Sequence, residues 1–334
     1  MSNPILVEVV REGWVESRHR GSVAVKDADG ATVLALGDVA QPIYPRSAVK
    51  ALQALPLVES GAAARYGFGD EELALACASH GGEPGHVAAA GRMLARAGLD
   101  AAALECGAHW PLHQPSGQAL ARSGGSASGL HNNCSGKHAG FLCVACATGA
   151  DHRRYVDPAH PVQRAVKATI EALAGLAISD APAVDGCSAP NWRVPLAALA
   201  CAFARFATGQ TLGAERAKAA ARLRAACAAQ PWFVAGTGRF CTVVMEHFQT
   251  RVFAKTGAEG VFCGALPELG LGIAIKCDDG ASRAAEVMMA AVVAHLLPLS
   301  DADRAVLDGF VHPKLRNWNG IEVGELRPTS ELLR

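Results

Sequence analysis

The chain is organised around a short stretch that reads Tyr44-Pro45-Arg46-Ser47-Ala48-Val49-Lys50 and is followed by an apolar run. Pro45 is typical of the first turn of a helix, where a missing N–H costs nothing. Val49, Leu52 and Leu55 then recur at helical spacing, which predicts a side that faces the core. The stretch therefore predicts the start of a helix that packs against the interior.

Within this stretch, Ser47 and Lys50 are three residues apart, so on a helix their side chains are neighbours. The Ser47 hydroxyl lies near the helix start, where free N–H groups and the helix dipole favour negative charge. A neutral Lys50 amine one turn away accepts the hydroxyl proton, which makes Ser47 a nucleophile. The alternative is a serine at a helix N-terminus and a solvated lysine. Because Ser-x-x-Lys is a short motif, this stretch alone leaves both interpretations open.

The composition is that of a globular protein with no attraction to nucleic acid or to an anionic membrane. Half of the 334 residues are hydrophobic and the formal net charge is zero. No apolar run is long enough to span a bilayer, and residues 1–8 show no secretory leader. The 11 cysteines are scattered and odd in number, which is typical of reduced thiols. We therefore expect a cytoplasmic protein.

Strand patterns lie at both ends of the chain and helical patterns in the middle. The strands are expected at 6–10, 15–20, 22–25, 31–36, 243–245, 251–255, 260–264, 272–276 and 319–323. The helices include 86–97 and 282–296, and residues 106–130 are expected to be irregular. This order predicts an α+β fold in one catalytic unit, residues 1–334. The terminal parts, about 1–45 and 232–334, would share an antiparallel sheet, and the helical part, about 46–231, would pack on it.

A second motif, Lys255-Thr256-Gly257, falls at the end of an expected strand. Lys-Thr-Gly on a strand is the distal element of penicillin-recognising serine enzymes, which pair it with Ser-x-x-Lys. Lys255 would lie beside the pocket, and backbone N–H groups of the strand would complete an oxyanion hole with that of Ser47. Ser79, in a Gly-rich loop, would be a proton relay. A hairpin with a solvated Lys255 and a helix C-cap at Ser79 are the alternatives, but the two motifs together favour a serine amidohydrolase.

A third pattern, Cys134-x-x-Lys137-His138 with the distant Cys187, suggests part of a metal site. Two thiolates are ligands suited to zinc, which needs at least a third. From ligand chemistry alone, His138 is the expected third ligand, because Lys137 must lose its proton before it can coordinate. Two buried cysteines beside a glycine turn are the alternative.

Taken together, these stretches resemble the rhizobial-type (class 3) L-asparaginases of the asparaginase II family. The resemblance runs in order along nearly the whole chain, and the His131–His138 block is its most specific part. The matching stretches are Arg46-Ser47-Ala48-Val49-Lys50, Cys77-Ala78-Ser79-His80, Glu105-Cys106-Gly107-Ala108-His109-Trp110, His131-Asn132-Asn133-Cys134-Ser135-Gly136-Lys137-His138, Asp185-Gly186-Cys187 and Gly236-Thr237-Gly238-Arg239-Phe240.

The resemblance implies hydrolysis of L-asparagine to L-aspartate and ammonia by a homodimer with a serine β-lactamase or glutaminase-like fold. Matched by position, Ser47 is the nucleophile and Lys50 its base, and Ser79 and Lys255 form a second serine–lysine pair. Cys134, Lys137 and Cys187 match a zinc site near the substrate, which replaces His138 by Lys137 as the third ligand. Arg46, Asp185 and the turn at Gly236 match substrate contacts, and His80, next to Ser79, is a further candidate contact.

Three other classes of function remain as alternatives. A zinc-dependent amidohydrolase would generate its nucleophile on the metal, and a glutaminase or β-lactamase-like serine hydrolase would share the serine but prefer another amide. A non-catalytic amino-acid-binding protein would bind asparagine and release no ammonia. Neither nucleic acid nor membrane is expected as a partner.

Overall fold

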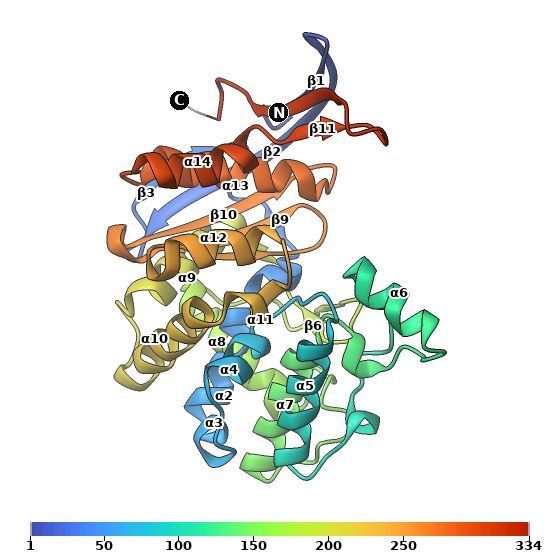
Figure 1. Ribbon diagram of the computed structural model, residues 1–334. Coiled ribbons are helices and arrows are strands. Elements are labelled where there is room, and N and C mark those ends of the chain that lie inside the picture. Colours follow the sequence, from blue (N-terminus) through green and yellow to red (C-terminus); the bar gives the residue numbers. More distant parts are fainter. Residues whose placement is uncertain (1, 333–334) are drawn as a thin grey trace.

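The computed structural model describes residues 2–332, in which an antiparallel sheet with its covering helices lies beside a helical region (Figure 1). The main sheet has the strand order β11-β12-β1-β2-β10-β9-β8, and β3 pairs with β2. Every strand pair in it is antiparallel. The strands are β1 (Ile5–Arg11), β2 (Trp14–Asp27), β3 (Thr32–Leu36), β8 (Phe253–Thr256), β9 (Val261–Leu266), β10 (Leu271–Cys277), β11 (Lys314–Arg316) and β12 (Glu322–Pro328).

The N-terminal and C-terminal strands share this sheet, because β1 pairs with β12 and β2 pairs with β10. The α+β class expected from the sequence is therefore confirmed. Two of the expected strands, 15–20 and 22–25, form the single strand β2. Its residues up to Arg20 pair with β1, and those from Gly21 onward pair with β10. Gly21 thus marks a change of partner within one strand and not a turn.

Helices cover both faces of the sheet. At Gly272 the backbone of α9 (Leu196–Thr208) comes so close to β10 that a Cβ would lie 2.0 Å from the Ala200 carbonyl oxygen, so only glycine fits. Successive residues of a strand point to opposite faces, so Ile273 faces α13 (Ser282–Leu296) on the other side. Helix α14 (Asp301–Val311) packs on α13.

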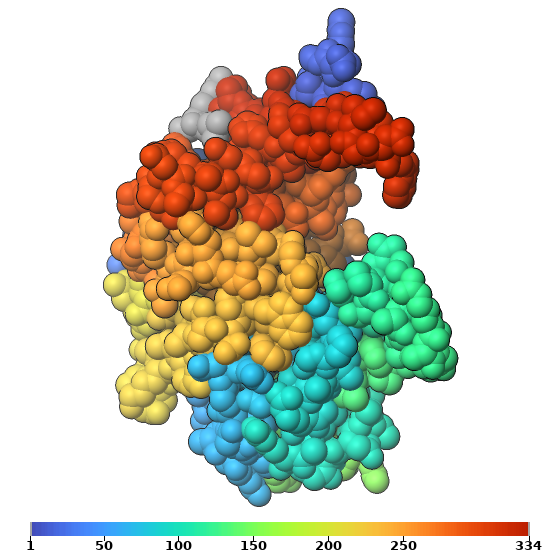
Figure 2. All heavy atoms as spheres, viewed as in Figure 1, coloured from blue at the N-terminus to red at the C-terminus, as the bar shows by residue number. Residues whose placement is uncertain are grey.

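Most of the remaining helices form the region below the sheet in Figure 1, whereas the last of them lies against β8 and α14, and the space-filling view shows one body from which α6 projects (Figure 2). None of the described helices is long and apolar enough to cross a membrane. These helices are α1 (Lys50–Gln53), α2 (Leu55–Glu59), α3 (Ala62–Arg65), α4 (Asp70–Ala76), α5 (Pro84–Arg96), α6 (Gln114–Arg122), α7 (Ser135–Thr148), α8 (Pro161–Ala174), α10 (Ala214–Ala229), α11 (Pro231–Ala235) and α12 (Phe240–Phe248).

Short elements complete the chain. The pair β4 (Pro42–Ile43) and β7 (Val194–Pro195) and the pair β5 (Ala183–Val184) and β6 (Pro190–Asn191) each form a two-stranded sheet. The 3₁₀ helices are η1 (Arg46–Val49), η2 (Ala101–Ala103), η3 (Gly129–His131), η4 (Gln249–Arg251) and η5 (Pro267–Leu269).

Two expectations about local structure were wrong. Residues 243–245, expected as a strand, lie in α12, where Phe240, Val244 and Phe248 are buried at helical spacing. The β-branched residues at 242–244 suggested a strand, but the longer apolar period decided the outcome. Residues 106–130, expected to be irregular, contain the nine-residue helix α6. The first strand after the helical region, β8, begins at Phe253.

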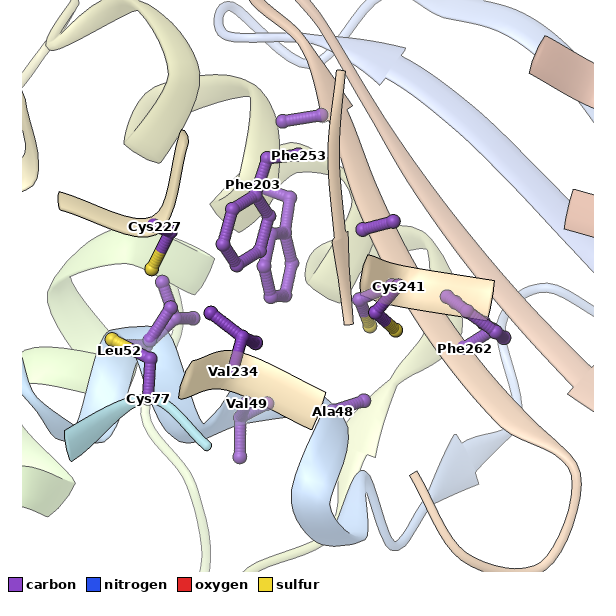
Figure 3. Close-up of a cluster of buried hydrophobic side chains, with 14 of the residues drawn as sticks. Ala48, Val49, Leu52, Cys77, Phe203, Cys227, Val234, Cys241, Phe253 and Phe262 are labelled. Carbon is purple, nitrogen blue, oxygen red and sulfur yellow. The ribbon is translucent and has the colours of Figure 1, made fainter. Parts of the chain in front are cut away.

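The opening stretch packs as its periodicity predicts. Val49, Leu52 and Leu55 are all buried, so the core-facing side is confirmed. Figure 3 shows Val49 and Leu52 in a buried cluster that includes Phe203 and Phe253. The helix itself is short, since η1 passes into a single turn of α1. Ala48 and Val49, the two residues that follow Ser47, belong to this cluster, so the turn that carries Ser47 is anchored in the core.

Candidate active site

The turn that carries Ser47 begins with an unusual backbone conformation. Pro45 precedes η1 as its N-cap residue, and Arg46 has a φ of 52°, a left-handed value that a non-glycine residue adopts only at a cost. Ser47 is half-buried, and within residues 2–332 its hydroxyl makes no hydrogen bond. Its N–H, in the first turn of η1, also has no intrahelical partner. Both groups are therefore available to a ligand.

Ser79 lies between two buried lysines. The Lys50 and Lys255 ammonium nitrogens each lie 2.9 Å from the Ser79 hydroxyl oxygen. Both lysine side chains and Ser79 are buried. Burial, and then the positive charge of Lys50, lower the pKa of Lys255 to about 7. Lys255 is thus able to give up its proton near neutral pH, which makes it fit for general base work.

Lys50 contacts Ser79 and not Ser47. Its Nζ donates to the carbonyl oxygens of Ala78 at 2.6 Å and Asn133 at 3.4 Å, in addition to the Ser79 contact. The structure therefore brings Lys50, Ser79 and Lys255 together, and it places Ser47 three residues before Lys50 without a hydrogen bond between their side chains. Asn133, a contact that sequence reasoning missed, lies in the family block; its carbonyl oxygen accepts from Lys50, and its side-chain oxygen accepts the Cys134 thiol at 3.2 Å.

Cys134, Lys137 and Cys187 converge at a second cluster. The Lys137 Nζ lies 3.2 Å from the Cys187 Sγ, and all three side chains are buried. A hydrogen bond from the Cys134 thiol, followed by the charge of Lys137, lowers the pKa of Cys187 to about 4 although burial acts against this. The same bond and burial raise the pKa of Cys134 to about 11. Burial opposes the charge of Lys137, but the two cysteines outweigh it and raise its pKa.

This donor set fits zinc. Two sulfur atoms and one nitrogen lie together, the pKa of the Cys187 thiol is lowered to about 4, and zinc binding would release the remaining thiol and ammonium protons. The geometry supports Lys137 as the third ligand, because its Nζ lies 3.2 Å from the Cys187 Sγ. The His138 Nδ1 is 2.7 Å from the Tyr155 hydroxyl, and its buried Nε2 has no hydrogen-bond partner among residues 2–332.

Arg46 and Asp185 join the turn that carries Ser47 to the cluster of Cys134, Lys137 and Cys187. The Arg46 Nε and Nη2 both lie 2.9 Å from one Asp185 carboxylate oxygen. Burial opposes the charge of Asp185, but Lys137, the Gly186 N–H and Arg46 together lower its pKa. The Asp185 carboxylate therefore interacts with two cations, Lys137 and Arg46. Asp185 lies two residues before Cys187, and Arg46 is the residue before Ser47.

The L-asparaginase II family model matches residues 7–328. The chain belongs to the L-asparaginase II family. The match covers nearly the whole sequence, so the resemblance seen in the motifs is confirmed. Membership of this family supports an amidohydrolase activity of the asparaginase type.

The similar solved structures include crystal structures of Mglu and of a β-lactamase. A crystal structure of Mglu is 15% identical, covers 80% of this chain and 64% of its own, and has a TM-score of 0.39. Mglu crystallised in 4.3 M NaCl is 17% identical, with 84% and 61% covered and a TM-score of 0.41. A β-lactamase from Mycobacterium bovis is 16% identical, with 87% and 93% covered and a TM-score of 0.36. The chain thus spans less than two thirds of these Mglu chains. No curated protein matches the chain.

Two of the expected substrate contacts, His80 and Gly236, already form hydrogen bonds within the protein. The His80 ring is fully buried, with Nε2 2.8 Å from the Ser135 hydroxyl and Nδ1 accepting the Gly82 N–H at 3.1 Å. Gly236 donates its N–H to Trp232 and accepts the Thr242 hydroxyl at 2.7 Å. His80 and Gly236 as direct substrate contacts stay predictions, and in this structure both support the loops around Ser79.

Sequence reasoning missed one buried carboxylate near the candidate site. Glu83, four residues after Ser79, is buried and accepts both the N–H and the hydroxyl of Thr237. The available signal was a charged residue within the run of small residues Gly81–Gly85. The small side chains of such a loop cannot bury a carboxylate, so its burial requires a partner from another part of the chain.

Proposed function

We propose that this protein is an L-asparaginase that hydrolyses L-asparagine to L-aspartate and ammonia through a serine acyl-enzyme. The observation that carries the proposal is the Ser79 hydroxyl held 2.9 Å from each of two buried lysine nitrogens. One of these lysines, Lys255, has a pKa of about 7 and so serves as a base at neutral pH. The family match supplies the substrate class.

In the first step, Ser47 attacks the side-chain amide carbon of asparagine. The Ser47 proton passes to Ser79, and the Ser79 proton passes to the neutral amine of Lys255. Lys50 orients Ser79, because its Nζ is held by that hydroxyl and by two carbonyl oxygens. This assignment places the base at Lys255, one of the two lysines that the sequence left open.

One backbone N–H group available for the oxyanion is that of Ser47, which has no intrahelical partner. The Thr256 N–H faces the Cys241 thiol, and the Gly257 N–H donates to the Val261 carbonyl at 2.7 Å, so neither is free. Strand β8 is the outermost strand of the sheet and packs on η1, so a backbone N–H group just after Gly257 would be the second oxyanion donor.

In the second half of the reaction, Lys255 returns its proton through Ser79 to the departing NH₂ group, which leaves as ammonia. Water then adds to the aspartyl ester carbon while the same Ser79–Lys255 pair takes its proton. The ester bond to Ser47 breaks, aspartate leaves, and Ser47 regains a proton from Lys255 through Ser79. Every proton removed in one half is thus replaced in the other.

Zinc is proposed at Cys134, Lys137 and Cys187, where it would supply a fixed positive charge that orients the α-amino or α-carboxylate group of the substrate. The chain's own charges have the same task. Asp185 attracts the α-amino group and Arg46 attracts the α-carboxylate, since each lies beside the turn of Ser47.

An ammonia-release assay tests the activity. We expect ammonia from asparagine, much less from glutamine, and no acylation by a penicillin probe, because the charged groups are arranged for a free amino acid. A chelator is expected to raise KM without abolishing kcat. Complete loss of activity on chelation together with turnover by Ser47→Ala would instead identify a zinc-hydroxide enzyme, and binding of asparagine without ammonia would identify a binding protein.

Metal content is expected to depend on Cys187. The wild type should carry about one zinc ion per chain by elemental analysis, and Cys187→Ser should carry less than about a fifth of that, because a thiolate ligand is lost. Cys146→Ser changes a free cysteine on α7 outside the cluster and should keep its zinc. Zinc retained by Cys187→Ser would remove this cysteine from the ligand set.

Two further properties belong to the proposal. A cytoplasmic location is supported by the cysteines, all 11 of which are free thiols in the structure. A homodimer is supported by the family resemblance alone, and sedimentation would measure it directly.

A further inference from the structure

A buried carboxylate that the proposed mechanism does not use lies behind the Ser79 loop. Glu83 is 6% exposed. Its Oε1 accepts the Thr237 N–H at 2.9 Å, and its Oε2 accepts the Thr237 hydroxyl at 2.7 Å. Both oxygens of one charged group are thus committed to a single residue in the turn formed by residues 236–239. Burying a carboxylate is costly, so such a commitment indicates a task for it.

The turn is shaped to receive this carboxylate. Gly236 has a φ of 105°, and a Cβ there would lie 2.5 Å from the Glu83 Oε1, so any other residue would strain the backbone and displace the carboxylate. On its far side the turn is tied to α12, because the Thr242 hydroxyl donates to the Gly236 carbonyl at 2.7 Å. The turn is therefore held between Glu83 and α12.

The same carboxylate belongs to the loop that carries Ser79. Glu83 follows Ser79 by four residues, and the Ser79 N–H donates to the Val234 carbonyl at 2.9 Å, two residues before Gly236. The loop of residues 79–83 is thus joined to residues 234–237 by two contacts, one at Ser79 and one at Glu83. A shift of the turn away from Glu83 would carry the Ser79 backbone with it, and with that the hydroxyl that reaches Lys255 at 2.9 Å.

Two histidines face Glu83 without satisfying it. The His86 Nε2 lies 3.0 Å from the Trp232 carbonyl and must donate to it, so Nδ1 carries a lone pair. That Nδ1 is buried, has no partner among residues 2–332 and lies 4.0 Å from the Glu83 Oε1. The His113 Nδ1 is 3.6 Å from Oε2 and is engaged with Ser116. Thr237 therefore supplies the hydrogen bonds to Glu83.

We propose that Glu83 is a positioning residue, whose carboxylate clamps Thr237 and thereby holds the Ser79 hydroxyl at the two lysines. The inference rests on the proposed role of Ser79 in proton transfer. It predicts an effect on the chemical step more than on substrate binding, because a misplacement of about 1 Å in a catalytic group lowers the rate by about a hundredfold.

The test compares Glu83→Gln and Thr237→Val with the wild type. The amide of Glu83→Gln keeps the size of the side chain but turns an NH₂ group towards one of the two Thr237 donors. We expect kcat for asparagine to fall about 10–100-fold with KM changed by less than about threefold. Thr237→Val removes the hydroxyl and keeps the N–H, so its kcat should fall about 3–10-fold. Both variants break the contact between Glu83 and Thr237, so the double variant should be no slower than the slower single variant within about twofold. Thr237→Val also removes the acceptor of the Trp232 Nε1–H at 2.9 Å, an exposed contact whose loss is expected to matter little.

Glu72→Gln is the matched control. Glu72 is also a buried glutamate, but it accepts the Gly69 N–H at the start of α4 and pairs with Arg96 at 3.5 Å, away from the Ser79 loop. Its substitution should lower the unfolding midpoint and leave kcat within about twofold of the wild-type value. If Glu83→Gln does not fold, Thr237→Val alone decides, and an unchanged kcat there overturns the proposal.

A folded Glu83→Gln with a kcat within about twofold of the wild type, or additive losses in the double variant, also overturns the proposal while the asparaginase function stands. If the wild type releases no ammonia from asparagine, the proposed function fails, and Glu83 is then tested by the rate at which a fluorophosphonate labels Ser47. Labelling slowed at least about tenfold in Glu83→Gln supports the clamp. Equal labelling, or none in the wild type, overturns it.

Discussion

Ser47→Ala is expected to lower kcat for asparagine by at least about a thousandfold while KM stays within about threefold of the wild type. The substitution removes the atom that forms the acyl bond and leaves Arg46, Asp185 and the thiol cluster to hold the substrate. Ammonia release measures the loss. Hydroxylamine added to the wild type should divert the acyl-enzyme to aspartyl hydroxamate, and Ser47→Ala should form none.

Ser79→Ala is the informative companion to this variant, because Ser79 and not Ser47 is the hydroxyl that contacts both lysines. With Ser79 as the relay, its loss should slow turnover by about a hundredfold, and mass spectrometry should still find a fluorophosphonate on Ser47. Turnover by Ser47→Ala at the wild-type rate, with the label on Ser79, would exchange the two roles. Either pattern identifies the nucleophile by the position of the label.

Much of the candidate site could be proposed from the sequence, because its residues lie in short local motifs. Ser47, Lys255 and the Cys134 block could each be named from residue type and spacing, and the terminal strands indicated their shared sheet. The contacts between motifs were not predictable in this way. Lys50 is three residues from Ser47, but the start of η1 has Arg46 in a left-handed conformation, and the lysine reaches Ser79 instead. Local periodicity does not encode that change of direction.

The missed features have the same physical origin, since each depends on a partner far along the chain. Glu83 and Thr237 are 154 residues apart, and neither lies in a pattern that announces the other. Part of helix α12 was predicted as a strand because it contains three consecutive β-branched residues. The burial of Phe240 and Phe248, which stabilises the helix, depends on distant elements that the local sequence does not reveal. Gly21 changes the partner of β2 without breaking the strand, which only the pairing register reveals.

Lys255→Met is expected to lower kcat by at least about a thousandfold without lowering stability, a combination that separates a catalytic base from a structural residue. Burial and the charge of Lys50 lower the pKa of Lys255 to about 7 from its ordinary value of 10.5. Between these two pH values the unfolded chain binds the proton and the folded chain does not, so this group makes stability rise with pH from about 7 to about 10.5. Below pH 7 the buried charge costs the folded state on the order of 5 kcal/mol.

Methionine removes that cost, and it also removes the hydrogen bonds of Lys255 to Ser79 and to the Thr256 carbonyl. The unfolding midpoint at pH 6 should therefore equal or exceed that of the wild type. The control Lys218→Met alters an exposed lysine paired with Glu215 at 2.9 Å, and it should change neither kcat nor the midpoint. A strongly destabilised Lys255→Met would show that the lysine contributes packing and hydrogen bonds that outweigh its buried charge.

The pH profile of the wild type tests the same assignment. Because only the neutral amine of Lys255 accepts a proton, kcat/KM should fall about tenfold per pH unit below about 7 and should level off above it. Lys255→Arg keeps the positive charge but cannot become neutral, so it should stay inactive at every pH tested. Since Lys50 is one cause of the low pKa, Lys50→Met should move the midpoint of any remaining activity towards higher pH. If kcat/KM of the wild type does not change between roughly pH 5 and pH 9, the base is another residue.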